Sequence, residues 1–446
     1  MTFREARDAL LCGELSQART ACDQLLQESA PDAQTLHLAG QIAVAERNFE
    51  LALRYFDSAL RVDPDQAATH FDRAVLLQRL QRHEPAIQAY DRLIRLRPRS
   101  ADARCNRGAA FAALNRLDEA IESFDEAIAL SADHAGAHFS RAVVWLLQGR
   151  LREGFTEFEW RWRTDAAREI AARWRFRRPP WLGESSIAGK TILVYAERGL
   201  GDTLQFCRYV PKLAALGATV YLQVQAPLLR LLSHLPGVAQ VFTDPDEAPV
   251  HDCHCPLLSL PLAFGTDAGS VPGETYLHAP VERVAHYRAS LAAGNAPRVG
   301  LVWRGDSANP DDVNRSIPIA TILDHLPSQF RYISLQYDPS PAELKRIATA
   351  PLSFTSCPNL GFIDTAALCE SLDLILCADT STAHLSGALG RPTWLMLPFS
   401  PDCRWMLNRS ESPWYPSMRL YRQAVSGQWD EVLERVTADL KSHFRG

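Results

Sequence analysis

The first third of the chain repeats itself every 34 residues. Registers that begin at Ala33 and restart every 34 residues align small residues at the eighth position: Gly40, Ala74, Gly108 and Ala142. They align small residues again at the twentieth position (Ala52, Ala86, Ala120 and Gly154) and aromatic residues at the twenty-fourth (Phe56, Tyr90, Phe124 and Phe158). A period of this length predicts stacked helical hairpins, in which small residues lie where two helices touch and an aromatic side chain fills the gap to the next hairpin.

This pattern resembles the tetratricopeptide repeat. Extended backward, the frame puts Ala18 and Cys22 at the twentieth and twenty-fourth positions, so we expect a capping hairpin followed by four repeats over residues 1–168. Such solenoids bind partners on a concave face, where the sixth positions hold Leu38, Asp72, Asn106 and Ser140. Only Asn106 could belong to the asparagine ladder of larger relatives, so clamping of any extended peptide is not expected. Capture of a specific protein and a role as spacer or oligomerisation module both stay open.

Composition limits the remaining function classes. The 446 residues are 47% hydrophobic and 22% charged, with a net charge of -5, which is typical of a globular protein without an overall attraction for nucleic acid or anionic lipid. The N-terminus has no secretory pattern and no later stretch is long and apolar enough to span a membrane, so we expect a cytoplasmic protein. The ten scattered cysteines are expected to be reduced.

Residues 169–188 read as a connector. Arginines alternate here with Trp174, Phe176 and Trp181, at positions 173, 175, 177 and 178. Such a pattern can stack on single-stranded nucleic acid, but packing of the aromatic side chains on the next domain is favoured. The string GESSIAGKT has five residues between its glycines and precedes a strand, so it is not a phosphate-binding loop. His251, Cys253, His254 and Cys255 alternate as in a strand and do not have the spacing of a metal site.

From Lys190 onward, short apolar runs alternate with glycine turns and amphipathic segments. This βαβ rhythm predicts parallel sheets with ligands at the carboxyl ends of their strands. One series fills 189–296 and a second fills 297–446, which predicts two Rossmann-like lobes. Neither series has the GxGxxG turn of a dinucleotide-binding domain.

Four ordered motifs carry a resemblance that covers nearly the whole chain. They are EWRW at 159–162, GLGDT at 199–203, DTSTAHLSGALGRP at 379–392 and the tail PDCRWMLNRSESPWYPSMRLYRQ. With the repeats, they resemble bacterial tetratricopeptide glycosyltransferases related to the heptosyltransferases and, remotely, to protein O-GlcNAc transferases. The resemblance implies an α-solenoid followed by a GT-B fold, with an acceptor lobe and a donor lobe. It also implies an inverting transfer of sugar from a nucleotide-diphosphate donor without metal or cofactor.

The resemblance also implies site residues. Asp202 matches the aspartate that acts as base, although it could equally cap the helix that follows. The loop beside it, Arg198, Gly199 and Gly201, would face the acceptor. The donor would contact the start of a helix and the ends of neighbouring strands, through Trp303, Arg315, Gln336, Asp379, Thr380, Ser381, Thr382 and His384. For Arg315, an ion pair with Asp311 or Asp312 is the alternative.

Three functions therefore remain at this stage. The first is a glycosyltransferase whose repeats present a protein acceptor. The second is a tetratricopeptide scaffold whose transferase region still binds nucleotide but no longer turns over. The third is a heptosyltransferase of lipopolysaccharide cores, in which the repeats are a spacer. Arg198 and the turn WRGDSANP depart from the family pattern, so the identities of sugar and acceptor do not carry over.

Overall fold

The chain divides into two compact units, 1–144 and 145–446, and the division falls within helix α9. The structure is a computed structural model that describes residues 2–28, 31–165, 174, 176, 179–292, 294–306, 312–357 and 359–444. The solenoid predicted over residues 1–168 extends past this division, because its fourth repeat begins before the division and ends after it, and its limit stays a prediction. The predicted limits of the connector and of the two lobes stay predictions.

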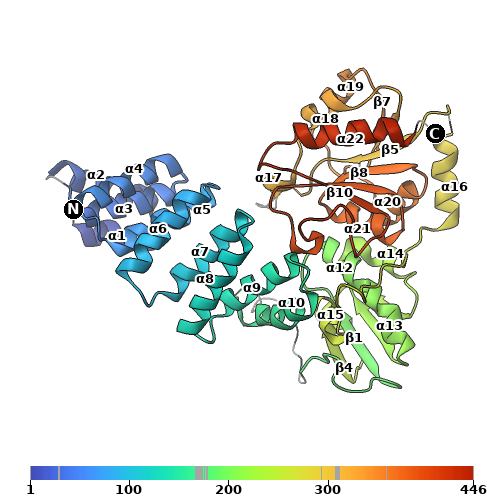
Figure 1. The fold of residues 1–446 in the computed structure, drawn as a ribbon, viewed down its shortest axis with the longest axis horizontal. Helices are drawn as coiled ribbons and strands as arrows, with labels where there is room; N and C mark the ends of the chain where they lie inside the picture. Colours follow the sequence, from blue (N-terminus) through green and yellow to red (C-terminus); the bar gives the residue numbers. More distant parts are fainter. Residues whose placement is uncertain are drawn as a thin grey trace. The chain divides into compact units, whose positions relative to one another are not determined.

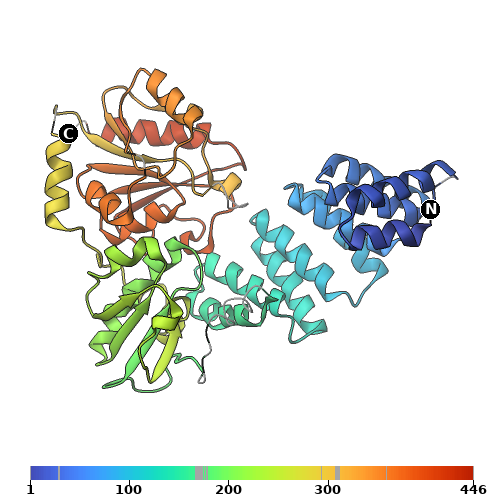
Figure 2. The same cartoon turned by 180° about the vertical axis from the view of Figure 1, so that it is seen from behind.

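Antiparallel helix pairs with the predicted period form the repeats (Figures 1 and 2). The helices are α1 (Phe3–Leu11), α2 (Leu15–Glu28), α3 (Ala33–Ala45), α4 (Phe49–Val62), α5 (Ala67–Arg79), α6 (His83–Leu96), α7 (Ala101–Ala113), α8 (Leu117–Leu130), α9 (Ala135–Leu147) and α10 (Leu151–Phe158). A Cβ atom at Gly40 would lie 2.4 Å from the Phe56 ring, and one at Gly108 would lie 2.6 Å from the Phe124 ring. The two glycines thus lie where the helices of one hairpin touch, as the sequence predicts, and each accommodates the aromatic ring of its own hairpin.

The turn inside each hairpin also repeats. Arg47, Gln81 and Asn115 have φ angles of 60°, 60° and 56°, and Gly149 has a φ of 81° at the equivalent place. The left-handed conformation costs a non-glycine residue energy, which the packing on either side of the turn must offset. The sequence pattern does not reveal this turn, because three of the four residues are not glycine.

The second unit contains two sheets in which every pairing between strands is parallel. The first sheet has the order β3-β2-β1-β4 and the second the order β10-β9-β8-β5-β6-β7. Their strands are β1 (Thr191–Tyr195), β2 (Thr219–Gln223), β3 (Val238–Phe242), β4 (Cys253–Pro256), β5 (Arg298–Val302), β6 (Arg331–Ser334), β7 (Ser353–Thr355), β8 (Leu374–Ala378), β9 (Thr393–Leu397) and β10 (Met418–Arg422). We call the first sheet with its helices the first lobe and the second sheet with its helices the second lobe.

Helices cover these sheets in a Rossmann-like arrangement. In the second lobe, α18 and α22 lie on one face of the sheet, and α20 and α21 lie on the other (Figure 1). The helices are α12 (Leu200–Phe206), α13 (Val210–Ala215), α14 (Leu229–Leu232), α15 (Leu260–Ala263), α16 (Val281–Ser290), α17 (Asp312–Arg315), α18 (Ile319–His325), α19 (Pro341–Thr349), α20 (Phe362–Cys369), α21 (Ser381–Ala388) and α22 (Asp430–His443). Short 3-10 helices are η1 (Glu159–Arg163), η2 (Cys207–Tyr209), η3 (Ala226–Leu228), η4 (Pro245–Glu247), η5 (Leu257–Ser259) and η6 (Cys403–Trp405).

The described part of the connector packs on the first lobe. The rings of Trp174 and Phe176 stack, and Phe176 stacks on His254 of β4 with ring centroids 3.6 Å apart. Trp181 is buried, and its backbone amide donates to the carbonyl of His254. These contacts confirm the predicted packing of the aromatic side chains and the predicted strand at His254. The arginines at 173, 175, 177 and 178 lie outside the described residues. Within the described part of the chain, no helix combines the length and the apolar character that a membrane crossing requires.

Candidate functional site

The starts of two helices, one from each lobe, face each other. Helix α12 follows β1, and α21 follows β8, so both begin at the carboxyl ends of parallel strands. The two helices are in tight contact at Gly201 of α12, where a Cβ atom would lie 2.7 Å from Cδ2 of His384 in α21. Glycine is therefore required at this position by the contact with the second lobe, and the sequence had placed Gly201 only on an acceptor-side loop.

Asp202 lies at this junction and uses both carboxylate oxygens. Its Oδ2 accepts a hydrogen bond from the amide of Gly199 at 3.0 Å, which caps the start of α12. Its Oδ1 accepts one from Nη2 of Arg404 at 2.7 Å. The helix-capping role that the sequence allows is thus present, and a charged partner from the second lobe accompanies it.

Arg404, in η6, connects the acidic groups of the site. Its Nε donates to Oδ1 of Asp402 at 2.7 Å, and its Nη1 lies 3.2 Å from Nε2 of His384. Burial raises the pKa of Asp402, but the nearby guanidinium of Arg404 outweighs burial and holds that pKa below its usual range. We refer to Asp202, Asp379, His384, Asp402 and Arg404 as the inter-lobe cluster.

His384 is uncharged in this cluster. Burial, and then the charge of Arg404, lower its pKa well below the usual value. Because Arg404 can only donate, the neutral ring accepts at Nε2, and its Nδ1–H donates to the hydroxyl of Tyr415 at 2.9 Å. The ring stacks on Trp405 with centroids 5.1 Å apart. Both nitrogens of His384 are thus engaged within the protein, and the sequence had assigned this residue to donor binding.

The remaining residues predicted at α21 surround the end of β8. Asp379 is buried, and its pKa is raised first by burial and then by the Asp402 carboxylate, while Arg404 and Arg315 act in the opposite direction. Thr380 is the N-cap residue of α21, and its Oγ1 lies 3.5 Å from Sγ of Cys377. Ser381 and Thr382 follow at the first two positions of the helix, where backbone amides precede the first carbonyl that could accept from them within the helix. This helix start can hold an anion.

Three other predicted residues hold local structure together. Nε of Arg315 donates to Oδ1 of Asp312 at 2.9 Å, which is the ion pair that the sequence left open. Trp303 is 1% exposed in the core of the second lobe. Oε1 of Gln336 accepts from the amides of Trp303 and Arg304 at 3.3 and 3.2 Å. In this state the Trp303 side chain offers no surface to a nucleoside, although the sequence predicts that it lines the pocket.

The sequence missed residues that join the lobes. Asp402 and Arg404 lie in the tail motif PDCRW, but the sequence pattern predicts no role for them in the site. Arg208 was also missed, although it is buried and its guanidinium donates to the carbonyls of Pro272 at 2.8 Å and Trp414 at 2.6 Å. The sequence does contain one indication of this site, the oppositely charged residues of DCR at 402–404, which follow soon after the apolar run of β9. On the acceptor side, Arg198 lies over the ring of Phe158 at 5.7 Å from its centroid.

Comparisons with known proteins bear on the repeats. A tetratricopeptide repeat family model matches residues 37–101, 76–134 and 105–159. Protein FlbA of Caulobacter vibrioides is 27% identical over 309 residues, which cover 63% of this chain and 51% of that protein. The chain thus spans about half the length of this relative.

Solved structures of MamA are also similar to part of the chain. One is 19% identical with a TM-score of 0.35 and covers 39% of this chain and 99% of its own. A second, MamA 41-end from Desulfovibrio magneticus RS-1, is 16% identical with a TM-score of 0.33 and covers 38% of this chain and 93% of its own. The chain contains tetratricopeptide repeats, and an α/β region with two parallel sheets follows them.

Proposed function

We propose that the chain is an inverting glycosyltransferase with a GT-B fold, which moves a sugar from a nucleotide-diphosphate donor to an acceptor hydroxyl. The observation that carries the proposal is the inter-lobe cluster. A carboxylate on the first lobe, Asp202, lies 2.7 Å from a guanidinium on the second lobe, Arg404, beside the starts of two helices that follow the carboxyl ends of parallel strands. Open α/β sheets bind ligands at such ends.

The proposed reaction needs a base and a cationic site. Asp202 would take the proton of the acceptor hydroxyl as its oxygen bonds to the anomeric carbon of the sugar. The bond from that carbon to the diphosphate breaks at the same time, and its electron pair leaves with the nucleoside diphosphate. Attack from the face opposite the leaving group inverts the anomeric carbon. One carboxylate suffices for this chemistry, whereas a retaining double displacement would also need a nucleophile.

Positive charge for the diphosphate would come from the second lobe. The backbone amides at the start of α21, together with Arg404 and Arg315, could stabilise the leaving group without a metal ion. In the present structure Arg404 pairs with Asp202 and Asp402. Donor binding would draw the guanidinium toward the diphosphate and free Oδ1 of Asp202 for the acceptor. Donor binding would thus free Asp202 to act as the base.

The repeats would present a protein acceptor to this site. Asp72, one of the concave-face positions, accepts hydrogen bonds from His37 and Gln41, both at 2.8 Å. This polar group spans two adjacent repeats and suits a specific partner better than an extended peptide of any sequence. Transfer to lipopolysaccharide cores, with the repeats as a spacer, is the same chemistry with another acceptor.

One observation favours the competing scaffold. Asp202 and Arg315 already have partners within the protein, as purely structural ion pairs do. Replacing Asp202 by asparagine distinguishes the glycosyltransferase from the scaffold. Asparagine keeps the oxygen that accepts from the Gly199 amide, so the helix cap persists, but it cannot take a proton.

The experiment measures release of nucleoside diphosphate from UDP-, GDP- and ADP-sugars, with melting temperature and donor affinity on the same samples. We expect Asp202→Asn to bind donor like the wild type and to lose about two to four orders of magnitude in turnover. Glu434→Gln, an exposed carboxylate on α22, is the matched control and should be silent. Full turnover in Asp202→Asn would refute the assignment of the base. Donor binding without turnover in the wild type, with every acceptor offered, would favour the scaffold.

A further inference from the structure

A cationic hollow lies on the first unit, among three helices of the repeats. It has a volume of about 300 Å³ and is formed by α4, α5 and α6. We call it the α4–α6 groove, and its lining residues are Asp57, Leu60, Arg61, His70, Arg73, Gln88, Ala89 and Arg92. Three arginines and a histidine therefore face one carboxylate.

The positive charge of this groove is only partly neutralised. Nε of Arg73 donates to Oδ1 of Asp57 at 2.7 Å, and Arg92 pairs with Asp65, which does not line the groove. Nη2 of Arg61 donates to the uncharged hydroxyl of Ser58 at 2.7 Å. The side chains of Arg73 and Arg92 are 26% and 40% exposed, so their remaining N–H groups can reach a ligand.

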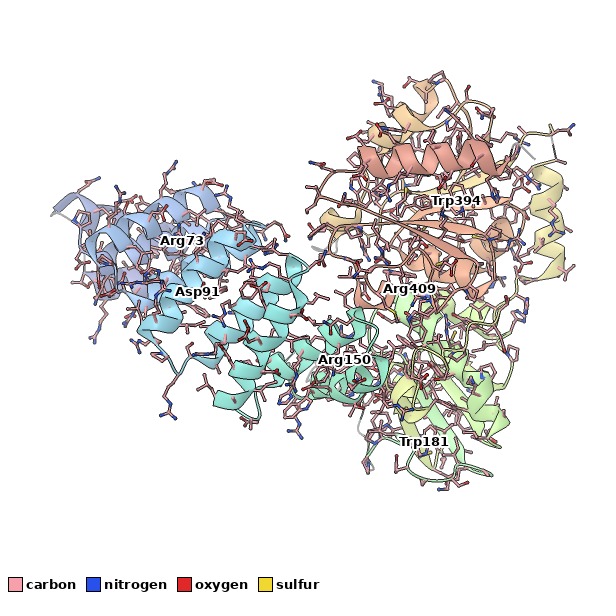
Figure 3. The ribbon with its side chains drawn as sticks, viewed as in Figure 1. Arg73, Asp91, Arg150, Trp181, Trp394 and Arg409 are labelled. Carbon is pink, nitrogen blue, oxygen red and sulfur yellow. The ribbon has the colours of Figure 1, made fainter. Side chains whose placement is uncertain are left out.

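The next repeat shows how the same scaffold accommodates a carboxylate. Shifted by 34 residues, the places of Asp57, His70, Arg73 and Arg92 are taken by Asp91, Arg104, Arg107 and Glu126. Here Nη1 of Arg107 donates to Asp91 at 3.0 Å, as Arg73 does to Asp57 (Arg73 and Asp91 are labelled in Figure 3). The carboxylate of Glu126 also accepts from Arg104 at 3.1 Å and from Arg107 at 3.0 Å.

Three positions thus differ in charge between the two repeats. Where the next repeat has Glu126, the α4–α6 groove has Arg92, and where the next repeat has Glu122 and Arg104, the groove has Gln88, which is uncharged, and His70. In the next repeat, a carboxylate of the chain itself lies between two arginines. The α4–α6 groove keeps Arg73 in the place of Arg107, adds Arg92 and lacks that carboxylate.

We propose that the α4–α6 groove binds an aspartate- or glutamate-rich segment of a partner protein, whose carboxylates pair with Arg61, Arg73 and Arg92. Guanidinium groups bind carboxylates through paired hydrogen bonds, and Leu60 and Ala89 supply an apolar floor for the methylene groups of the bound side chain.

A polypeptide fits this groove better than a nucleic acid. No phenylalanine, tyrosine or tryptophan lines it, so His70 is the one ring on which an unpaired base could stack, and successive bases would find no platform. The hollow has the size of a few side chains rather than of a channel that follows a phosphate backbone.

Binding of a labelled peptide to the full chain tests the proposal. The probes are a fluorescein-labelled hexaglutamate peptide, its hexaglutamine counterpart and a single-stranded oligonucleotide, each followed by fluorescence anisotropy. We expect the glutamate peptide alone to bind, and its binding to weaken as salt is raised. Tighter binding of the oligonucleotide, or equal binding of the glutamine peptide, would overturn the proposal.

Charge reversal locates the binding site. Arg92→Glu introduces the residue type that the next repeat has at the equivalent position, Glu126, and Arg61→Glu reverses a second charge on another helix. Each variant should weaken glutamate-peptide binding about tenfold or more. Arg4→Glu makes the same change in charge on α1, outside the groove, and should change binding less than about twofold. Circular dichroism verifies that each variant is folded. Loss of binding in all three variants, or in none, would overturn the proposal. The assay involves no sugar transfer, so its outcome is independent of the proposed enzyme.

Discussion

A buried ion network supports the loop that leads to Asp202, and its central residue is Arg161. The guanidinium makes two hydrogen bonds of 2.9 Å to Glu197, one of 2.6 Å to Glu159 and one of 2.8 Å to Ser259. The side chains of Arg161 and Glu197 are 3% and 1% exposed. Glu197 lies two residues after the end of β1 and precedes the candidate site, so the network joins the motif EWRW to that site.

Replacing Arg161 by methionine removes the cation and leaves two carboxylates at a buried position. Breaking one side of such a buried pair costs about 3 to 5 kcal/mol, because the remaining charge keeps its desolvation penalty.

Urea denaturation of Arg161→Met, followed by tryptophan fluorescence, measures this loss of stability. Arg152→Met is the matched control, since Arg152 is 70% exposed and forms a 3.5 Å pair with Asp267; it should cost less than about 1 kcal/mol. Adding Glu197→Gln to Arg161→Met should restore part of the lost stability. A loss below about 1 kcal/mol for Arg161→Met, or no recovery in the double variant, would refute the reasoning.

Three further outcomes are expected. Gly201→Ala should lower stability by about 1 to 3 kcal/mol and weaken donor binding, because the added methyl group meets His384; an unchanged melting temperature would contradict this. The raised pKa of Asp379 means that the folded protein favours the protonated carboxyl, and the stability that this protonation contributes is lost as the pH rises through that pKa. Asp379→Asn should therefore stabilise the protein more at about pH 8 than at about pH 5 in urea titrations. The reverse order would count against the raised pKa. Arg315→Ala and Thr380→Val should each weaken nucleotide-diphosphate binding by about 1 to 3 kcal/mol in calorimetry, and unchanged affinity in both would remove the donor from this helix start.

The repeats were predictable because their signals are local and recur. A glycine such as Gly40 and the ring that it accommodates, Phe56, are 16 positions apart in one hairpin, and the same relation returns at Gly108 and Phe124. The parallel strands were predictable for a similar reason, since each is a short apolar run that ends in a glycine or polar corner.

Burial of individual side chains was less predictable. Trp303 directly follows an apolar strand at a ligand-binding edge, a position from which a side chain can turn outward or inward. In the structure the Trp303 side chain points into the core of the second lobe, and its Nε1 donates to Oε1 of Glu343 at 2.6 Å. That partner is 40 residues away, so no local pattern in the sequence distinguishes the two orientations.

The inter-lobe cluster depends on pairing over a much longer distance. Asp202 and Arg404 are 202 positions apart, and each has a satisfactory local interaction: Asp202 caps α12, and Arg404 pairs with Asp402. Local chemistry therefore explains both residues without the other, which is why the sequence singled out Asp202 alone. Their contact depends on the approach of the lobes, which Gly201 permits and Arg208 stabilises by binding Trp414. An anion that enters the cluster must compete with two carboxylates for Arg404, and in the proposed function this competition couples donor binding to release of the base.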